Sequence, residues 1–393
     1  MRVLFIHNKY QYKGGEDTVF EAEVAMLKKY GNDVSTLLFN NVSITGALNK
    51  IKYGINSFYS SVSAKSLERM ILDFSPDIIH VHNFFPIASP SIFFVANKYN
   101  IPIVITLHNY RLLCPNAMFF LEGNVCERCI NKLFPVKGVI NGCYRNSKLE
   151  TFSLASMILL HRMIGTWHNR IDRFIVLTNF AKNKFIKSSM SLPENKIRVK
   201  PNFVVDNGLN YDKDDYFLFV GRLSEEKGID ILLDAFEGTK YNLQIIGTGP
   251  KEKDVQVSSL RNKNTIYLGY QTIDVIKEKL KKAKALIFTS ILYEGMPMTI
   301  LEAFSTGTPV IGGNIGGPAE MVKDNYNGLL YEAGNVIDLK NKVDWLYKHP
   351  KEAMEMSKNA RKEFESFYTE ENNYKQLMQI YSDAINEKEK SNK

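Results

Sequence analysis

Short, fully apolar runs alternate with segments of helical spacing along the first half of the chain. RVLFIH at residues 2–7 is typical of a strand buried in a parallel sheet. TVFEAEVAMLKKY at residues 18–30 has helical spacing, and Gly31 predicts the end of that helix. Further strand-like runs are PDIIHVHN (76–83), IPIVITLHN (101–109) and DRFIVLT (172–178). Strands and helices that alternate in this way predict a parallel sheet with both faces covered.

The same pattern restarts after VKPNFVVDNG at residues 199–208, which we interpret as a linker because it contains Pro, Asn and Gly. The strand-like runs that follow are YFLFVGRL (216–223), YNLQIIGTGP (241–250), NTIYLGY (264–270), KALIFTS (284–290) and TPVIGG (308–313). A length of 393 residues also favours two domains. The fold class is therefore α/β, with two doubly wound, Rossmann-like domains over residues 1–202 and 203–367, then a C-terminal helix and tail over 368–393. Tyr374, Leu377, Met378 and Tyr381 fall on one face of that helix.

Polar, glycine-rich motifs directly follow the predicted strands. They are HNKYQYKGGED, LHNYR, GRLSEEKG, GTGP, EGMP and GGNIGGPAE. Ligands of open parallel sheets bind outside the carboxyl ends of the strands. The motifs therefore predict two binding faces, opposed across the linker to form a cleft.

GRLSEEKG places Arg222 directly after a strand and Lys227 five residues later. Arg offers a rigid fork of donors and Lys a point charge, a pair that suits a diphosphate. The alternative is that both are surface cations paired with Glu225 and Glu226. Their position after a strand favours the binding role.

Two glycine motifs predict close approach of the backbone to a ligand. Gly247 and Gly249 form a tight turn after a strand, where the chain could approach a base or ribose. Gly316 and Gly317 precede Pro318, which suits the first position of a helix whose amides could face an anion. Either motif alone is common in βα turns.

EGMPMTILE places two glutamates around a turn and the start of a helix. Glu294 follows the buried strand KALIFTS, and Gly295 and Met296 offer backbone N–H groups beside it. Glu302 falls within the first two turns of a helix that begins near Pro297, where the helix dipole favours its ionised form. A carboxylate there could accept hydrogen bonds from ribose hydroxyls. A capping glutamate plus a solvated one is the alternative, but it explains Glu302 less well among apolar neighbours.

The order of GRL…EKG, GTGP, EGMPMTILEA, GTPVI and GGPAE resembles the carboxyl domain of the family-four retaining glycosyltransferases, which have the GT-B fold and an E-x7-E signature. The resemblance covers about residues 200–335, and GGE at 14–16 and LHN at 107–109 match more loosely. It implies a first domain that binds the acceptor, a second that binds a nucleotide sugar, and a C-terminal helix that crosses back to the first domain.

The resemblance also implies roles for single residues. Arg222 and Lys227 would bind the diphosphate, Glu302 the ribose, and Glu294 the transferred sugar. His108 would face the reacting sugar, and catalysis would rest on His108, Glu294, Arg222 and Lys227. The donor site would comprise these cations and glutamates together with Gly14, Gly15, Gly221, Gly247, Gly249, Gly295, Met296, Pro297 and Met298. The family often has Asp after the histidine, whereas this chain has Asn109, which leaves no carboxylate at that position.

The implied reaction is transfer of a sugar from a nucleoside diphosphate of the UDP or GDP type to a glycan or polyprenyl-linked acceptor. Similar sequences serve capsular, exo- or O-antigen polysaccharide synthesis in bacteria. Fixed cations and helix N-termini stabilise charge on the leaving diphosphate, so we expect no catalytic metal. Attack on the face that the diphosphate leaves would retain the anomeric configuration and need no protein nucleophile.

All four cysteines, Cys114, Cys126, Cys129 and Cys143, lie in one segment, about residues 110–148. Cys-x-x-Cys has metal-ligand spacing, and four thiolates could form a structural zinc site. An iron–sulfur cluster and unliganded thiols are the alternatives. Within the glycosyltransferase resemblance the segment looks like a subgroup insertion into the acceptor-binding domain.

The formal charge of +8 suggests either anionic partners or a lysine-rich, solvated surface. Net charge is the one feature that favours nucleic-acid binding, and we therefore expect no nucleic-acid partner. No signal peptide or membrane-spanning run is evident, which predicts a cytoplasmic protein. SLASMILLHRMIGTWHNRIDRF (153–174) is amphipathic and basic, with Trp167, and could dock on the inner membrane surface or be a core helix. His80, His82 and His161 are more often core or surface histidines than metal ligands.

Three other functions are compatible with this fold. A GT-B phosphorylase lacks a convincing pyridoxal-lysine context here, and the ordered motifs argue against a GT-B epimerase. A non-catalytic scaffold that binds partners through the cysteine segment has no physical reason to keep Arg222, Lys227, Glu294 and Glu302. The sequence names neither base, sugar, acceptor nor oligomeric state.

Overall fold

The computed structural model describes residues 1–9, 14–40 and 54–391, so part of the predicted glycine loop, residues 10–13, lies outside the described residues. The chain forms two compact units, which are described separately. The first contains residues 1–119, 126–200 and 374–393, and the second contains residues 120–125 and 201–373. The sequence-based boundary was placed between residues 202 and 203, with the final helix as a segment of its own.

The first unit has a six-stranded, wholly parallel sheet in the order β2-β1-β3-β4-β7-β8. Its strands are β1 Arg2–Lys9, β2 Asp33–Asn40, β3 Ile78–Asn83, β4 Ile103–Leu107, β7 Arg173–Val176 and β8 Ile197–Val199. β1, β3, β4 and β7 are almost entirely buried, as expected for strands covered on both faces.

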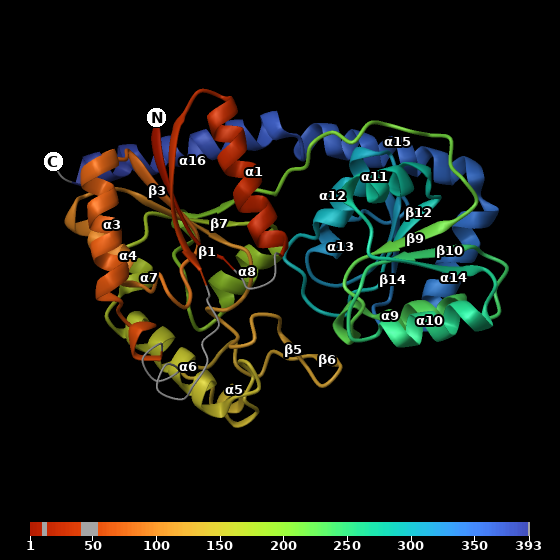
Figure 1. Ribbon diagram of the computed structural model, residues 1–393, viewed down its shortest axis with the longest axis horizontal. Coiled ribbons are helices and arrows are strands. Elements are labelled where there is room, and N and C mark those ends of the chain that lie inside the picture. The colour runs from red at the N-terminus through yellow and green to blue at the C-terminus, as the bar shows by residue number, and fades with distance from the viewer. Residues whose placement is uncertain (10–13, 41–53, 392–393) are drawn as a thin grey trace. The chain divides into compact units, whose positions relative to one another are not determined.

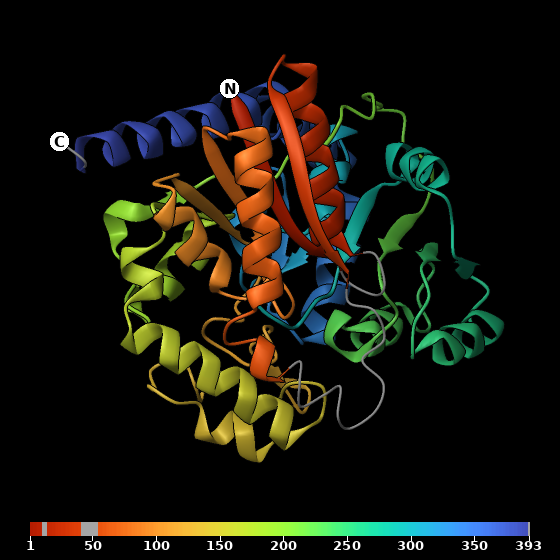
Figure 2. The same cartoon turned by 60° about the vertical axis from the view of Figure 1, so that its left-hand side comes forward.

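Helices cover both faces of this sheet (Figures 1 and 2). α3 (Ser61–Phe74) and α4 (Ser91–Lys98) pack together on one face, while α1 (Gly15–Lys29) and the C-terminal helix α16 (Glu370–Ser391) cover the other. The remaining elements of this unit are α5 Val136–Ile140, α6 Lys148–Met163, α7 Thr166–Asn169, α8 Asn179–Lys187 and η1 Glu194–Lys196.

The predicted apolar face of the C-terminal helix anchors α16 to the first unit from Tyr374 onward. Leu377 and Tyr381 are fully buried, and Tyr374 stacks on Tyr30 with ring centroids 4.1 Å apart. The Tyr381 hydroxyl also lies 2.7 Å from Nδ1 of His80 in β3. A helix from the end of the chain therefore contributes to the core of the first sheet.

The second unit has a parallel sheet in the order β11-β10-β9-β12-β13-β14. Its strands are β9 Phe217–Val220, β10 Leu243–Ile246, β11 Thr265–Gly269, β12 Ala285–Phe288, β13 Val310–Gly313 and β14 Gly328–Tyr331. α9 (Ile229–Phe236), α10 (Glu252–Arg261) and α14 (Val336–Lys348) lie on one side, and α11 (Ile273–Lys282), α12 (Met298–Ser305) and α15 (Pro350–Phe367) on the other (Figure 1). Shorter elements are η2 Glu225–Lys227, α13 Pro318–Met321 and the hairpin of β5 Phe120–Leu121 and β6 Asn124–Val125, which groups with this unit.

The prediction of two parallel, doubly wound sheets is confirmed, but three strands were not anticipated. β2, β8 and β14 follow helices or loops and are short or only half-buried. β2 and β14 are edge strands of their sheets, and so is β8. An edge strand is covered less completely, so its sequence lacks the continuous apolar run that identifies the central strands.

Candidate functional site

Each sheet reverses its strand order at one point, and polar motifs gather at both points. In the second unit the order changes direction between β9 and β12, and in the first unit between β1 and β3. Connections from adjacent strands leave in opposite directions there, which opens a crevice at the carboxyl ends. Residues directly after these four strands are therefore the first candidates for function.

In the second unit, β9 and β12 bring Lys227 and Glu294 together. Lys227 ends the short helix η2 after β9, and its Nζ forms an ion pair with Oε1 of Glu294, which follows β12. Both side chains remain partly exposed. Lys227 therefore pairs across the sheet rather than with Glu225 or Glu226, the local alternative. Arg222 is exposed and makes no hydrogen bond or ion pair with the described residues.

Hydrogen bonds between the two loops fix the position of Glu294. Ser290 donates from Oγ to Oε1 of Glu294 at 2.8 Å and lies 3.2 Å from the carbonyl oxygen of Glu226. The Ile291 amide also donates to that carbonyl, at 3.1 Å. One carboxylate oxygen of Glu294 thus contacts both Ser290 and Lys227. From the sequence, Lys227 and Glu294 were expected to bind different parts of the donor, the diphosphate and the sugar, and their direct contact was not expected. Ser290 was not predicted, but it ends the apolar strand motif directly before the loop.

Two glycines of this site allow backbone to pack directly on backbone. At Gly247 (φ +145°) a Cβ would lie 1.8 Å from the carbonyl oxygen of Gly221. At Gly317 a Cβ would lie 2.2 Å from the carbonyl oxygen of Gly295, and the Gly317 amide donates to the Glu294 carbonyl at 3.0 Å. The predicted glycine turns therefore hold the loops after β9, β10, β12 and β13 against one another. The Gly317 amide serves this packing, so it is not free for the anion that the sequence suggested.

The predicted helix after EGMP is α12, which begins at Met298 and ends at Ser305. The amides of Gly295 and Met296 make no hydrogen bond within the described residues, which leaves them available to a ligand. Glu302 is half-buried on this helix, and burial raises the pKa of its carboxyl group, while Lys277 opposes that shift. Burial therefore opposes ionisation of Glu302, whereas the helix dipole was expected to favour it.

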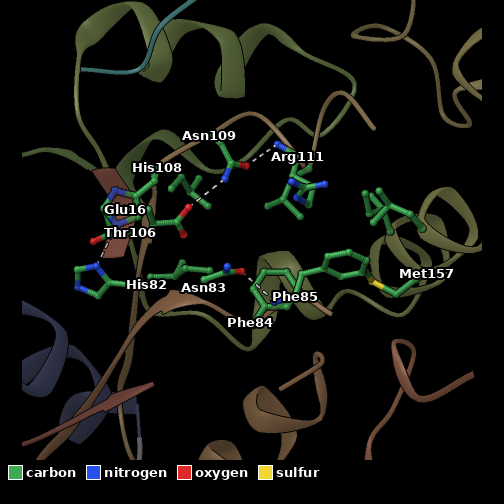
Figure 3. A pocket seen from close by; sticks show the side chains of 15 residues that line it. Glu16, His82, Asn83, Phe84, Phe85, Thr106, His108, Asn109, Arg111 and Met157 are labelled. Atoms are coloured by element: carbon green, nitrogen blue, oxygen red, sulfur yellow. Dashed lines mark hydrogen bonds between the residues drawn. The ribbon is translucent and has the colours of Figure 1, made fainter. Parts of the chain in front are cut away.

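In the first unit, His108 follows β4 and lines a small pocket (Figure 3). The pocket is lined by Glu16, His82, Asn83, Phe84, Phe85, Ile105, Thr106, Leu107, His108, Asn109, Arg111, Leu112, Leu154, Met157 and Ile158. The polar side chains come from the loop after β4, from the end of β3 and from the start of α1. The predicted histidine therefore lies at a concave site with both polar and aromatic walls.

His108 is the outermost member of a chain of buried ionisable groups. Its Nε2 lies 2.9 Å from Nδ1 of His82, and Nε2 of His82 lies 3.2 Å from Oε2 of Glu23. The other oxygen of Glu23 is 2.7 Å from Nζ of Lys200, and both of these side chains are fully buried. The chain runs Lys200, Glu23, His82, His108, from the interior to the pocket.

The charge of Glu23 sets the protons along this chain. Burial opposes its ionisation, but Lys200 and then His82 and His80 hold the pKa of Glu23 well below its ordinary value. A carboxylate beside Nε2 of His82 favours a proton on that nitrogen, which makes Nδ1 an acceptor for the N–H at Nε2 of His108. His108 then presents an unprotonated Nδ1, consistent with burial, which holds its pKa well below the usual value.

Within the described residues, Glu23, His80 and His82 are the one group whose possible ligand atoms lie close enough together, within 4.8 Å of one another, to bind a metal ion. Their hydrogen bonds argue against it. Both ring nitrogens of His80 contact hydroxyls, Tyr381 at 2.7 Å and Thr106 at 2.8 Å, and Lys200 already neutralises Glu23. We therefore interpret the group as a buried network of hydrogen bonds and ion pairs, in which Oε2 of Glu23 and Nε2 of His82 are close but not hydrogen-bonded.

The glycine motif before α1 is held by a second buried pair. Asp17 accepts from the Gly14 amide at 2.9 Å, and its other oxygen lies 2.8 Å from Nε2 of His7, at the end of β1. Burial lowers the pKa of His7, and the contact with Asp17 opposes this shift. Gly14 and Gly15, predicted to approach the donor phosphates, therefore begin α1 at the point where the first sheet reverses.

A carboxylate does lie beside His108, although the sequence has Asn109 where similar enzymes often have Asp. Nδ2 of Asn109 lies 3.5 Å from Oε2 of Glu16, the glutamate of the GGE motif (Figure 3). Arg111 lies over the rings of Phe85 and Tyr144, at 5.6 and 5.3 Å from their centroids. The pocket thus contains both a carboxylate and a guanidinium that the motifs did not assign to it.

Glu23 and Lys200 were not predicted from the sequence, and His82 was predicted only to be a core or surface histidine, which its burial bears out. Glu23 occupies a core position of α1, four residues after Val19 and three before Met26, both of which are buried. A glutamate on the apolar face of a helix was a usable signal. Lys200 stood in the predicted linker and gave no such signal.

The amphipathic segment after the cysteines has a buried and an exposed face. Trp167 and His161 are buried, and Nε2 of His161 lies 2.8 Å from the Phe58 carbonyl oxygen. Leu149, Phe152 and Met163 of α6 are exposed. The tryptophan is therefore a core residue, and any surface contact of this segment falls to the other face of α6.

Solved structures show the same fold. HepE of Anabaena, solved in complex with UDP, superposes with a TM-score of 0.68 over 98% of this chain and 100% of its own, at 15% identity. The family model for glycosyl transferases group 1 matches residues 204–363, and that for Glycosyltransferase Family 4 matches residues 54–207. The protein is a GT-B glycosyltransferase. Arg222, Lys227, Gly247 and Glu294, which were predicted to bind the donor, fall within the first of these matches, and His108 falls within the second.

Curated relatives match this glycosyltransferase over most of its length. An uncharacterized glycosyltransferase of Methanocaldococcus jannaschii is 28% identical over 363 residues, 87% of each chain. The lipopolysaccharide 1,6-galactosyltransferase of Salmonella typhimurium is 25% identical over 358 residues, 86% of this chain and 87% of its own. Within the described residues, no helix is both long and apolar enough to cross a membrane.

Proposed function

We propose that this glycosyltransferase moves a sugar, with retention of anomeric configuration, from a nucleoside-diphosphate sugar to a glycan or polyprenyl-linked acceptor in polysaccharide assembly. The observation that carries this proposal is the contact of Lys227 with Glu294 at the point where the second sheet reverses, with Arg222 exposed on the same loop as Lys227. The lipopolysaccharide galactosyltransferase among the relatives supports the class of product.

Arg222 and Lys227 are the groups proposed to bind the diphosphate. When the sugar–phosphate bond breaks, negative charge develops on the leaving diphosphate, and two fixed cations stabilise it more than they stabilise the intact donor. The ion pair keeps Lys227 in place before a donor arrives. Binding of phosphate would then offer Lys227 a second anionic partner without requiring new loop structure.

Glu294 is proposed to position the transferred sugar. One of its oxygens is taken by Lys227 and Ser290, which leaves the second oxygen to accept from a sugar hydroxyl. The amides of Gly295 and Met296 are neighbouring donors for the same ligand. Glu302, half-buried on α12, is proposed to accept from the ribose hydroxyls, because its carboxylate makes no hydrogen bond or ion pair among the described residues.

His108 is proposed to contact a substrate hydroxyl in the first unit, and His82 to position it. An unprotonated Nδ1 can accept a hydrogen bond, and the Glu23–His82 pair holds the ring in the tautomer that presents it. Replacing His82 by Gln would leave His108 in place but remove this constraint. NMR correlations to the ring nitrogens of 15N-histidine-labelled protein would then show a mixed tautomer at His108, whereas a single tautomer would contradict the positioning role.

The donor site is tested by nucleotide binding. UDP, GDP, ADP, dTDP and CMP are compared by thermal shift with the wild-type protein, with UDP first because HepE, of the same fold, was solved with UDP. A ligand at 100 times its Kd stabilises a protein by about 2.7 kcal/mol. We expect one nucleoside diphosphate to raise the melting temperature and Arg222→Ala to reduce that rise.

Arg261→Ala is the matched control, since Arg261 is also exposed in the second unit but lies at the end of α10. It should leave the shift unchanged. No shift with any nucleotide in folded protein, or equal shifts in wild type and Arg222→Ala, would contradict the diphosphate assignment. With the donor identified, 1H NMR of the first product formed reports retention or inversion directly.

The exposed face of α5 and α6 is proposed to contact an anionic membrane surface, where a polyprenyl-linked acceptor would lie. Val136, Ile140, Leu149, Phe152, Leu160, Met163 and Ile164 are exposed large apolar side chains. Residues 131–164 contain the basic residues Lys132, Lys137, Arg145, Lys148 and Arg162 but only one acidic residue, Glu150. Apolar and basic side chains on one surface are typical of an interfacial segment.

Vesicle sedimentation tests this contact. We expect binding to vesicles that contain anionic lipid and weaker binding to neutral ones, with loss in Phe152→Asp. Leu72→Asp, at an exposed apolar position of α3, is the control and should bind as wild type does. Equal binding to both vesicles, or loss in both variants alike, would contradict the assignment to α5 and α6.

A further inference from the structure

The segment from Leu113 to Ser147 has little regular structure of its own. Its only elements are β5 and β6, of two residues each, and the five-residue helix α5. Long stretches without secondary structure are uncommon inside compact domains, and small irregular units usually need a metal or disulfides. The backbone nevertheless makes regular turns, with the Cys126 amide donating to Phe119 at 2.7 Å and the Lys132 amide to Cys129 at 3.1 Å.

Gly138, on α5, is the point where the cysteine-bearing loops meet. A Cβ at this buried glycine would lie 3.5 Å from Sγ of Cys129 and 3.1 Å from Cγ of Pro115, the neighbour of Cys114. The Cys143 amide donates to the Gly138 carbonyl at 3.0 Å. Cys126 joins the group through the Cys-x-x-Cys turn. Three loops that are separate in sequence thus bring their cysteines to one short helix.

Cys114 and Cys129 also line one small pocket, together with Pro115. Burial raises the pKa of Cys143, and the thiols of Cys129 and Cys126 raise it further. Burial likewise raises the pKa of Cys114 to about 12, with Cys129 and Cys143 adding to the shift. Without a cation, burial keeps these thiols protonated, so a bound metal is what would convert them to thiolates.

We propose that Cys114, Cys126, Cys129 and Cys143 bind one Zn²⁺ that holds this segment together. Zn²⁺ accepts four thiolates in a tetrahedron with Zn–S bonds of about 2.3 Å, and Cys-x-x-Cys supplies two of them from one turn. Within the described residues, which include all four cysteines, no three of the sulfurs lie within 4.8 Å of one another. Binding therefore requires rotation of cysteine side chains inward, with loss of the thiol protons to solvent.

The zinc would also support the surface proposed to contact the membrane. α5 exposes Val136 and Ile140 on one side and turns Gly138 toward Cys129 and Pro115 on the other. The five-residue helix is too short to be stable alone. A metal beneath it would fix the orientation of its exposed apolar side chains. The metal proposal itself rests on the cysteines and does not depend on a glycosyltransferase reaction.

Metal analysis of the purified full-length protein, prepared without chelators or a histidine tag, tests the proposal. We expect about one zinc per chain by mass spectrometry of the metals, and no iron or labile sulfide. Exchange for Co²⁺ should give the thiolate-to-cobalt charge-transfer band and the visible bands of a tetrahedral site. Titration with a mercurial reagent should release the zinc as each of the four Zn–S bonds is replaced by an S–Hg bond, which consumes about four equivalents of reagent per zinc.

Cys126→Ser should bind less than half of the wild-type zinc, while Met118→Leu, which removes a non-ligand sulfur from the same segment, should bind as wild type does. The zinc content of the wild-type protein decides the proposal, so misfolding of Cys126→Ser would neither support nor contradict it. Wild-type protein without stoichiometric zinc, with four thiols that react freely before and after a chelator, would overturn it. Iron with sulfide, or disulfides found by mass spectrometry, would also overturn it.

Discussion

Each unit contains an ion pair between a lysine and a glutamate, but the two pairs are buried to very different degrees. In the first unit, Glu23 and Lys200 are both fully buried, and histidines surround them. In the second unit, Lys227 and Glu294 form an ion pair that stays partly exposed and rests on glycine-rich backbone. The first arrangement can act only through His108, whereas the second can contact a ligand directly.

This difference predicts which substitutions change the stability of the protein and which change ligand binding. A buried pair contributes little net stability as a pair, but removal of one partner leaves an uncompensated charge in the interior. A partly exposed pair is screened by water, and its loss changes stability little. Substitutions in the first unit should therefore act mainly on folding, and those in the second mainly on ligand binding.

Glu23→Gln should have the largest effect. It removes the buried negative charge that lies 2.7 Å from Nζ of Lys200, and breaking a buried pair costs about 3–5 kcal/mol. Denaturant unfolding followed by hydrogen exchange in each unit would show the loss confined to the first unit. The double variant Glu23→Gln/Lys200→Met removes both charges and should recover part of the stability. A single variant within about 1 kcal/mol of wild type would mean that Lys200 finds another partner.

Mildly acidic pH should have the second-largest effect and should destabilise the first unit. Six of the seven histidines lie there, and burial lowers the pKa of His7, His80, His108 and His161. These side chains stay neutral in the folded chain, whereas in the unfolded chain they take up protons below about pH 6.5. Their contribution to stability is complete above that pH and is lost as the pH falls from there toward the folded pKa values. At pH 5.5, each histidine that stays neutral in the folded chain would lower the free energy of unfolding by about 1.4 kcal/mol.

Hydrogen exchange at pH 7.5 and at pH 5.5 distinguishes the units. We expect faster opening of the first unit at the lower pH, after correction for the intrinsic exchange rate, and little change in the second. Glu23 does not oppose this trend, because Lys200 and the histidines keep its pKa low and it stays ionised over this range. Equal loss of protection in both units would contradict the assignment to buried histidines.

Gly247→Ala should have an intermediate effect and should act in the second unit. At φ +145° the backbone suits glycine alone, and such strain costs about 1–3 kcal/mol. The added Cβ would also meet the Gly221 carbonyl oxygen at 1.8 Å and push the loop after β9 outward. Nucleotide affinity should fall with stability. Gly238→Ala, also at positive φ but with no atom within 4 Å of the new Cβ, should lose stability without losing affinity.

The sequence predicted the second site better than the first for a physical reason. Arg222, Lys227, Gly247 and Glu294 each lie in a loop directly after an apolar strand, so local spacing was enough to place them at one edge of the sheet. The buried chain of the first unit joins Glu23 on a helix, His82 on a strand and Lys200 beyond the last strand of that sheet. Its members become neighbours only once the sheet order is known.

The central strands of both sheets were predictable for the same reason that the edge strand β2 was not. Central strands such as β4 are buried on both faces and therefore appear as unbroken apolar runs. β2 has mostly half-buried and exposed positions, so no apolar run marks it. At Glu302 the sequence showed the helix dipole, which favours the ionised form, but it did not show the burial that raises the pKa of the carboxyl group.

Glu294→Gln should have the smallest effect on stability and so gives the sharpest contrast with Glu23→Gln. The amide keeps the shape and can still accept from Ser290, but it loses the charge that faces Lys227. For a partly exposed pair the loss is about 0–1 kcal/mol, so urea unfolding should be nearly unchanged. Nucleotide affinity should also be kept, because Arg222 and Lys227 remain, while transfer activity should fall. If Glu294→Gln unfolded as easily as Glu23→Gln, the pair would be a structural element of the second unit, and the positioning of the sugar would have to be assigned to other residues of that loop.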